Sequence, residues 1–149
     1  MKNIQHGAHD SIVYGVDNVQ RAVDFIYPLF AASAVITLTG SLGAGKTTLV
    51  QALLERAGVT GPIQSPTFTY VNTYDVPGGL HIHHFDLYRL HTLEEFLESG
   101  FDEYLYQKNG KALIEWPAII DPLLKHEVCH IALDYEGLDL RRLTYRCVK

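Results

Sequence analysis

A glycine-rich octapeptide between an apolar run and a helical pattern constrains this chain more than any other feature. Residues 40–47 read Gly-Ser-Leu-Gly-Ala-Gly-Lys-Thr and match G-x-x-x-x-G-K-[S/T]. Residues 34–39 before it are an apolar run of strand length, typical of a strand that is covered on both faces. Residues 48–57 after it are typical of a helix. This order predicts a loop whose backbone N–H groups surround an anion such as a phosphate group.

The side chains of the octapeptide suit a nucleoside triphosphate. Lys46 offers a positive charge to the β- and γ-phosphates, and the Thr47 hydroxyl is a ligand for a metal ion. We therefore expect ATP and Mg²⁺ as cofactors. The predicted cofactor-binding residues are Ser41, Leu42, Gly43, Ala44, Gly45, Lys46, Thr47 and Thr48.

One alternative is a glycine-rich turn that only caps a helix. A chance match to the pattern is expected in roughly one of 200 chains of this length, and the flanking strand and helix are those that phosphate binding requires. The Asn-Lys-x-Asp element typical of guanine-specific proteins does not occur in the sequence, which favours ATP over GTP.

Two carboxylates are candidates for the second half of such a site. A phosphate-binding loop needs an acidic residue at the end of a neighbouring strand to hold Mg²⁺, directly or through water. Asp86 follows the strand-like residues 82–85, and Glu115 follows residues 112–114. Either carboxylate could instead be a surface residue or a helix cap, and the pattern alone leaves both options open.

The remaining patterns alternate between strands and helices and predict an α/β fold in one domain, residues 1–149. Turn residues 75–79 separate two strand patterns, which predicts an antiparallel hairpin. Thr92 and Glu95 have the spacing of a capping box. We expect a P-loop NTPase-like three-layer sandwich with a mixed sheet, a parallel core and antiparallel additions. The predicted strands are residues 11–14, 34–39, 68–74, 80–85, 111–115, 128–133 and 143–148; the predicted helices lie near residues 19–30, 48–57, from 92 onward, and 102–106.

Histidines cluster in the second strand of the hairpin. His81 and His83 share one face of a strand, whereas His84 points to the opposite face, so too few side chains converge for a transition-metal site. We expect solvated or hydrogen-bonded histidines. Arg89 is a candidate phosphate ligand or the partner of a surface carboxylate, and the pattern supports both.

The two cysteines, Cys129 and Cys147, lie on separate strand patterns without a short spacing. This arrangement predicts neither a disulfide framework nor a zinc site. We expect free thiols that are buried or half-buried.

Charge and hydropathy limit the partners and the location. The net charge is −5, and no basic stretch is longer than residues 141–142, so the chain is a poor binder of nucleic acid on its own. Any RNA in its pathway is expected to be held by a partner protein. No run of 18 apolar residues occurs, and residues 1–6 lack the apolar segment of a signal peptide, so we expect a cytoplasmic protein without membrane contact.

Four segments together resemble one family. Their order and spacing are similar to those of the bacterial threonylcarbamoyladenosine biosynthesis ATPases, the TsaE (YjeE) family, and the resemblance extends from about residue 14 to residue 133. The glycine-rich loop alone is shared with many ATPases, so the other segments make the match specific. They are residues 40–49 (GSLGAGKTTL), 65–69 (SPTFT), 84–90 (HFDLYRL) and 113–117 (LIEWP).

The resemblance implies an ATP-binding and ATP-hydrolysing subunit required for threonylcarbamoyl modification of adenosine 37 in tRNAs that read codons beginning with A. It implies a TsaD-like transferase and a TsaB-like companion as partners, with tRNA contacted only through the complex. By the same resemblance, Lys46, Asp86 and Glu115 are catalytic, with Lys46 on the phosphates and Asp86 near the metal or the attacking water. Thr47 and Glu115 hold Mg²⁺, and the stretch around Tyr14 lies near the adenine.

One departure and two competing functions belong beside this prediction. The family commonly has aspartate at the position of Ser41; phosphate binding by backbone N–H groups does not need that side chain, but any acid–base or metal-tuning role of the aspartate is lost here. A small-molecule kinase could use the same loop, although the sequence has no compact segment of arginines to serve as a lid. A nucleotide-gated binding module, in which hydrolysis only resets a complex, cannot be separated from the ATPase by sequence.

Overall fold

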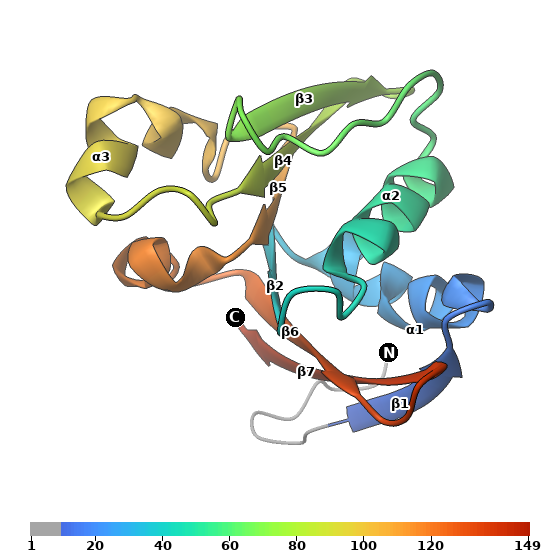
Figure 1. Cartoon of the computed structure of the whole chain (residues 1–149). Helices are drawn as coiled ribbons and strands as arrows, with labels where there is room; N and C mark the ends of the chain where they lie inside the picture. The colour runs from blue at the N-terminus through green and yellow to red at the C-terminus, as the bar shows by residue number, and fades with distance from the viewer. Residues whose placement is uncertain (1–9) are drawn as a thin grey trace.

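The structure, a computed structural model, describes residues 10–149 and is built on one seven-stranded mixed sheet (Figure 1). The strand order is β1-β7-β6-β2-β5-β4-β3. The four central strands β6, β2, β5 and β4 run parallel. At one edge β3 pairs antiparallel with β4; at the other, β7 pairs antiparallel with β6, and β1 pairs antiparallel with β7. The predicted mixed sheet with a parallel core and antiparallel additions is confirmed. The strands are β1 (Asp10–Gly15), β2 (Val35–Thr39), β3 (Val71–Val76), β4 (Leu80–Asp86), β5 (Gly110–Glu115), β6 (Val128–Tyr135) and β7 (Leu140–Val148).

Helices cover both faces of the central strands (Figure 1). The long helices α1 (Val19–Ala32) and α2 (Lys46–Ala57) pack on one face, and α3 (Leu93–Glu98) lies on the other with the 3₁₀ helices η1 (Phe101–Tyr104) and η2 (Pro117–Leu123). Each face has its own apolar cluster. Among residues 10–149, no helix is long and apolar enough to cross a bilayer.

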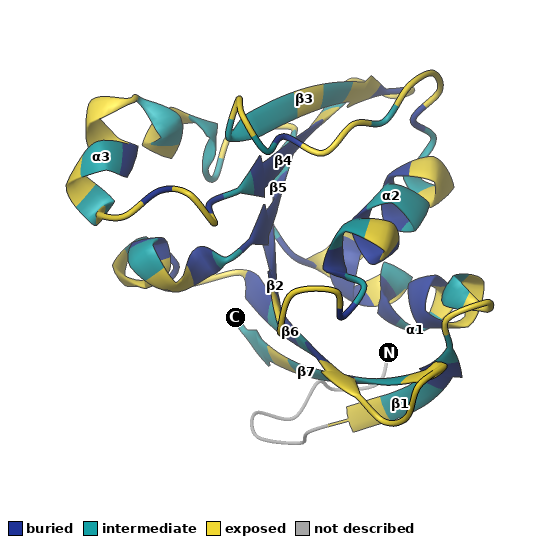
Figure 2. Cartoon of the chain, viewed as in Figure 1, coloured by how far each residue is buried: buried dark blue, intermediate teal, exposed yellow. Residues whose placement is uncertain are grey.

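The burial pattern explains why β2 and β5 are largely apolar on both faces. In β2, Ile36 and Leu38 belong to the cluster under α1 and α2, and Val35 belongs to the cluster on the opposite face. Strands covered on both sides are apolar on both sides, and Figure 2 shows β2 and β5 buried along most of their length. At β2 and β5, the carboxyl edge of the sheet, rather than a face, is therefore where charged side chains can meet solvent.

Local signals set the start of α3 and the end of α2 where the sequence predicts them, whereas η2 is not predicted and the helix expected near residues 102–106 is the 3₁₀ helix η1. Thr92 Oγ1 accepts a hydrogen bond from Glu95 N at 3.1 Å, as the capping-box spacing predicts. Gly58 ends α2 in a left-handed conformation. Strand β3 begins at Val71 instead of at residue 68, because Tyr70 is left-handed (φ 66°) and its N–H bonds Pro66 O at 2.8 Å, which closes a turn.

The prediction of free thiols is wrong. Cys129 and Cys147 form a disulfide between β6 and β7. The two cysteines are directly opposite each other in the antiparallel register of these strands, although they are 18 positions apart in the sequence. The expected burial is right in kind, since Cys129 is fully buried and Cys147 is half-buried.

Lys111 on β5 closes the end of α1. Its ammonium group donates to the carbonyl oxygens of Phe30 (2.8 Å), Ala31 (3.1 Å) and Ser33 (2.6 Å). The last carbonyls of a helix have no partner within the helix and carry its negative dipole end, so a lysine suits this position. Burial lowers the pKa of Lys111, and the nearby Glu127 carboxylate partly offsets that shift. The contact ties the α1 layer to the strand that ends at Glu115.

We expect Lys111→Met to lower the free energy of unfolding by about 2 kcal/mol, because charged hydrogen bonds contribute about 1.5–3 kcal/mol and three carbonyl groups lose their donor. Urea unfolding followed by circular dichroism measures the change. The exposed Lys108 gives a matched control, and Lys108→Met should stay within about 0.5 kcal/mol of the parent. Equal stabilities of the two variants would contradict this role of Lys111.

Candidate functional site

The loop between β2 and α2 has a backbone that requires glycine. Gly40 has φ 146°, and a Cβ atom there would lie 2.5 Å from the carbonyl oxygen of Leu133. Gly45 is the N-cap of α2 in a left-handed conformation, with φ 102°. A glycine N-cap has no side chain to accept from the first N–H groups of the helix, so these donors and the positive end of the helix dipole are available to an anion.

Lys46 lies folded over this loop and is 5% exposed. Its Nζ donates to the carbonyl oxygens of Gly40 and Ser41, the latter at 3.0 Å, and lies 4.1 Å from the centre of the Trp116 ring. Burial lowers the pKa of Lys46, while the carboxylates of Glu115 and Asp86 raise it. The ammonium group is therefore a partly desolvated cation between the loop and two acids.

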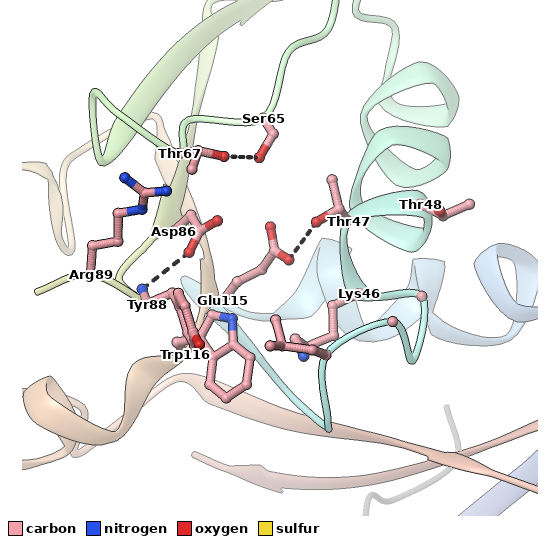
Figure 3. Close-up of a pocket in the computed structure, with 13 residues that line it drawn as sticks. Lys46, Thr47, Thr48, Ser65, Thr67, Asp86, Tyr88, Arg89, Glu115 and Trp116 are labelled. Carbon is pink, nitrogen blue, oxygen red and sulfur yellow. Dashed lines mark hydrogen bonds between the residues drawn. The ribbon is translucent and has the colours of Figure 1, made fainter.

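Glu115 ends β5 and joins that strand to α2. It is 2% exposed, and its Oε1 accepts a hydrogen bond from Thr47 Oγ1 at 2.8 Å (Figure 3). Its Oε2 lies 2.6 Å from Nε2 of His84 on the adjacent strand β4. Both carboxylate oxygens thus have a partner, as a buried acid requires.

Asp86 ends β4 directly beside Glu115, its partner in the parallel register of β4 and β5. Its Oδ1 accepts a hydrogen bond from Tyr88 N at 3.1 Å. Burial raises the pKa of Asp86, and the charge of Glu115 raises it further, whereas the Tyr88 bond, His84 and Lys46 lower it. The two acids therefore have different surroundings at the same edge of the sheet.

These side chains meet in a cavity of about 440 Å³ at the carboxyl edge of the central strands. The loop forms one wall, and the segments around residues 65–67 and 86–89 form the other (Figure 3). The structure brings most of the predicted site residues together here: Leu42, Gly43, Gly45, Lys46, Thr47, Thr48, Asp86 and Glu115 all line the cavity. Ser41 does not line the cavity. It contacts the other site residues through its carbonyl oxygen, which accepts a hydrogen bond from Lys46 Nζ.

A second cavity of about 210 Å³ lies on the other side of the loop. It shares Gly43, Gly45 and Thr48 with the first cavity and also includes Ala44. Tyr14, Val16, Val19 and Arg141 form its remaining wall. The segment around Tyr14 therefore lies beside the loop, although β1 is at the edge of the sheet.

The oxygen donors at this edge are of the kind that Mg²⁺ prefers. Among residues 10–149, no group of three or more His, Cys, Asp or Glu side chains could hold an ion. Mg²⁺ needs fewer side chains, because it keeps several waters and usually takes one or two protein oxygens together with substrate phosphates. Thr47 Oγ1 and Glu115 Oε1 are two such oxygens at 2.8 Å from each other.

The histidines of β4 are hydrogen-bonded, as the sequence predicts. His81 pairs with Asp75, and His83 contacts Thr73 and Gln107. The sequence does not predict the contact of His84 with Glu115. Strand alternation shows that His84 faces away from His81 and His83, but only the strand order, in which β4 lies beside β5, identifies Glu115 as the partner of His84.

Arg89 lines the cavity and packs on an aromatic ring rather than pairing with an acid. Its Cζ lies 4.8 Å from the centre of the Phe68 ring, and Phe68 is 80% exposed. No ion pair of Arg89 occurs among the described residues. Of the two predicted options, the surface ion pair is not observed.

Comparison with known proteins places the chain in a family. The family profile described as "Threonylcarbamoyl adenosine biosynthesis protein TsaE" matches residues 15–143. A tRNA threonylcarbamoyladenosine biosynthesis protein TsaE from Bacillus subtilis is 40% identical over 114 residues, which cover 76% of this chain and 70% of that protein. The Aquifex aeolicus protein of the same name is 36% identical over 130 residues, 86% of each chain.

A solved structure agrees with the sequence matches. The crystal structure of Bacillus subtilis YdiB superposes with a TM-score of 0.69 at 30% sequence identity, covering 95% of this chain and 88% of that one. The segments that carry the sequence resemblance are also those that meet at the carboxyl edge of the sheet. On this evidence, the chain belongs to the TsaE family of threonylcarbamoyladenosine biosynthesis proteins.

Proposed function

We propose that this chain is a P-loop ATPase that binds and hydrolyses ATP with Mg²⁺ in the biosynthesis of threonylcarbamoyladenosine in tRNA. The contact between Thr47 and Glu115 carries the proposal, because it places a hydroxyl and a buried carboxylate side by side next to a loop with unused N–H donors. A structural turn that only capped α2 would not need this acid.

Each group of residues in the site has a separate role in phosphoryl transfer. The N–H groups of the loop and the ammonium of Lys46 hold the phosphates and neutralise their charge. Asp86 accepts a hydrogen bond from the attacking water and orients it, a task for which its position beside Glu115 at the strand end is suited. Trp116, whose ring lies over Lys46, excludes water from one side of the ammonium.

Thr47 and Glu115 would hold Mg²⁺ through Oγ1 and Oε1, directly or through water. When bound, the ion neutralises negative charge on the β- and γ-phosphates. Because Glu115 is almost fully buried, its negative charge is poorly screened by solvent and favours a cation at this position.

The second cavity is the proposed place of the adenine. It shares Gly43, Gly45 and Thr48 with the phosphate cavity, so the base and the phosphates of one nucleotide can occupy the two neighbouring cavities. The aromatic ring of Tyr14 and the apolar side chain of Val16 give it walls on which a base can pack.

The proposal includes protein partners, a TsaD-like transferase and a TsaB-like companion, with tRNA reached only through them. The net charge of −5 supports indirect contact with tRNA, because a protein that binds nucleic acid directly needs cations to neutralise the phosphates. Among the described residues that line the phosphate cavity, Arg89 is the one arginine, and it packs on Phe68. A kinase lid brings several arginines to a transferred phosphate. This difference supports a slow ATPase over the alternative, a small-molecule kinase. A cytoplasmic location stays a prediction.

We expect Lys46→Ala to weaken the binding of a non-hydrolysable ATP analogue at least tenfold in calorimetric titration, because the charge on the β- and γ-phosphates loses its cation. AMP, which lacks these phosphates, should bind with unchanged affinity. Lys125→Ala removes an exposed lysine and should match the parent for both nucleotides. Equal affinity of Lys46→Ala and Lys125→Ala for the ATP analogue would contradict the phosphate role.

Turnover should depend on the partners. We expect phosphate release from ATP to be slow for the chain alone and to change at least tenfold when TsaD-like and TsaB-like proteins from the same source are added, since the described lining of the phosphate cavity has a single arginine, Arg89. Adding the partners to Lys46→Ala controls for ATPase activity of their own. Identical rates with and without the partners would count against the proposed assembly.

A further inference from the structure

The strongest feature that the proposed function leaves unused is the buried contact between His84 and Glu115. His84 on β4 is fully buried, and its Nε2 lies 2.6 Å from Glu115 Oε2. His84 and Glu115 come from adjacent parallel strands, with His84 opposite Leu113 in the register. Both side chains point to the face of the sheet that α1 and α2 cover, because Ile82 and Leu113, two residues before them on their strands, belong to the apolar cluster of that face.

The hydrogen bonds fix which nitrogen carries the proton. A carboxylate only accepts, so Oε1 accepts from the Thr47 hydroxyl and Oε2 accepts from the Nε2–H of His84. Nδ1 of His84 is buried and has no hydrogen-bond partner among residues 10–149. Without a proton on Nε2, two acceptors would lie 2.6 Å apart, so Nε2 carries a proton.

We propose that His84 is a positioning residue that orients the Glu115 carboxylate for Mg²⁺. Two donors on opposite oxygens hold the plane of the carboxylate, and with Oε2 taken by His84, Oε1 is the oxygen that faces Thr47. Partners that orient a metal-binding side chain commonly change metal affinity 10–100-fold when removed. The inference rests on the proposed function, since it needs Thr47 and Glu115 as the metal-holding pair.

His83 provides a matched control on the same strand. It is also buried and also hydrogen-bonded, to Thr73 at 2.8 Å and to Gln107 at 2.9 Å, and its ring packs edge-on against Tyr104. It points to the opposite face of the sheet from His84. Replacing His83 therefore disturbs the same strand to a similar extent without touching Glu115.

The test is calorimetric titration of the full chain with a non-hydrolysable ATP analogue, once with Mg²⁺ and once with EDTA. We expect His84→Leu to weaken the Mg²⁺-dependent affinity 10–100-fold and to leave the metal-free affinity within about twofold of the parent, because the loop and Lys46 do not depend on His84. His84→Gln, whose side-chain N–H can donate to Oε2, should recover most of the loss. His83→Leu should show the parental Mg²⁺ dependence.

The titrations of the His84 and His83 variants distinguish a positioning role of His84 from a merely structural one. A parental Mg²⁺ dependence in His84→Leu, or an equal loss in His83→Leu, would overturn the positioning role. If His84→Leu does not fold, comparing His84→Gln with His84→Asn still decides, because the shorter amide does not reach Oε2; equal Mg²⁺ affinities of these two variants would also overturn it.

A double-variant comparison keeps this inference distinct from the function on which it rests. Glu115→Gln should lose the Mg²⁺ dependence by itself, and adding His84→Leu to it should cause little further loss, because both act through one carboxylate. Additive losses would mean that His84 acts elsewhere and would overturn the inference alone. Parental Mg²⁺ dependence in Glu115→Gln would instead overturn the proposed metal site, and the role of His84 with it.

Discussion

A buried carboxylate at the end of a central strand organises this molecule. Glu115 sits at 2% exposure, and such a group is stable only when its oxygens are hydrogen-bonded. Thr47 supplies one partner from the first turn of α2, and His84 supplies the other from β4. One side chain thereby joins the glycine-rich loop, the long helix and two parallel strands, and the polar edge of the sheet is built around it.

The rest of the fold explains how this edge stays polar while the strands stay apolar. Helices on both faces bury the side chains of β2 and β5, so charged groups are confined to the strand ends and the loops beyond them. Lys46 and Asp86 join Glu115 there, each partly desolvated, and burial is the main cause of the shifted pKa of both groups. A cluster of incompletely solvated charges in a cavity is typical of a functional site.

Much of this arrangement can be read from the sequence, and the exceptions have physical causes. The octapeptide and the acids that follow apolar strands identify Lys46, Thr47, Asp86 and Glu115, because parallel strands bring their carboxyl ends to one edge. The partner of His84 and the disulfide of Cys129 depend on which strands are neighbours and in what register, and local patterns do not carry that information. The late start of β3 depends on the left-handed Tyr70, for which the sequence offers no glycine as a signal.

The most direct measurement of the central claim is a crystal structure of the chain with Mg²⁺ and a non-hydrolysable ATP analogue. The account predicts the phosphates inside the loop formed by residues 40–47, and the metal on Thr47 Oγ1 with Glu115 bound to it directly or through one water. Phosphates bound away from the loop, or a metal held without Thr47 and Glu115, would contradict it.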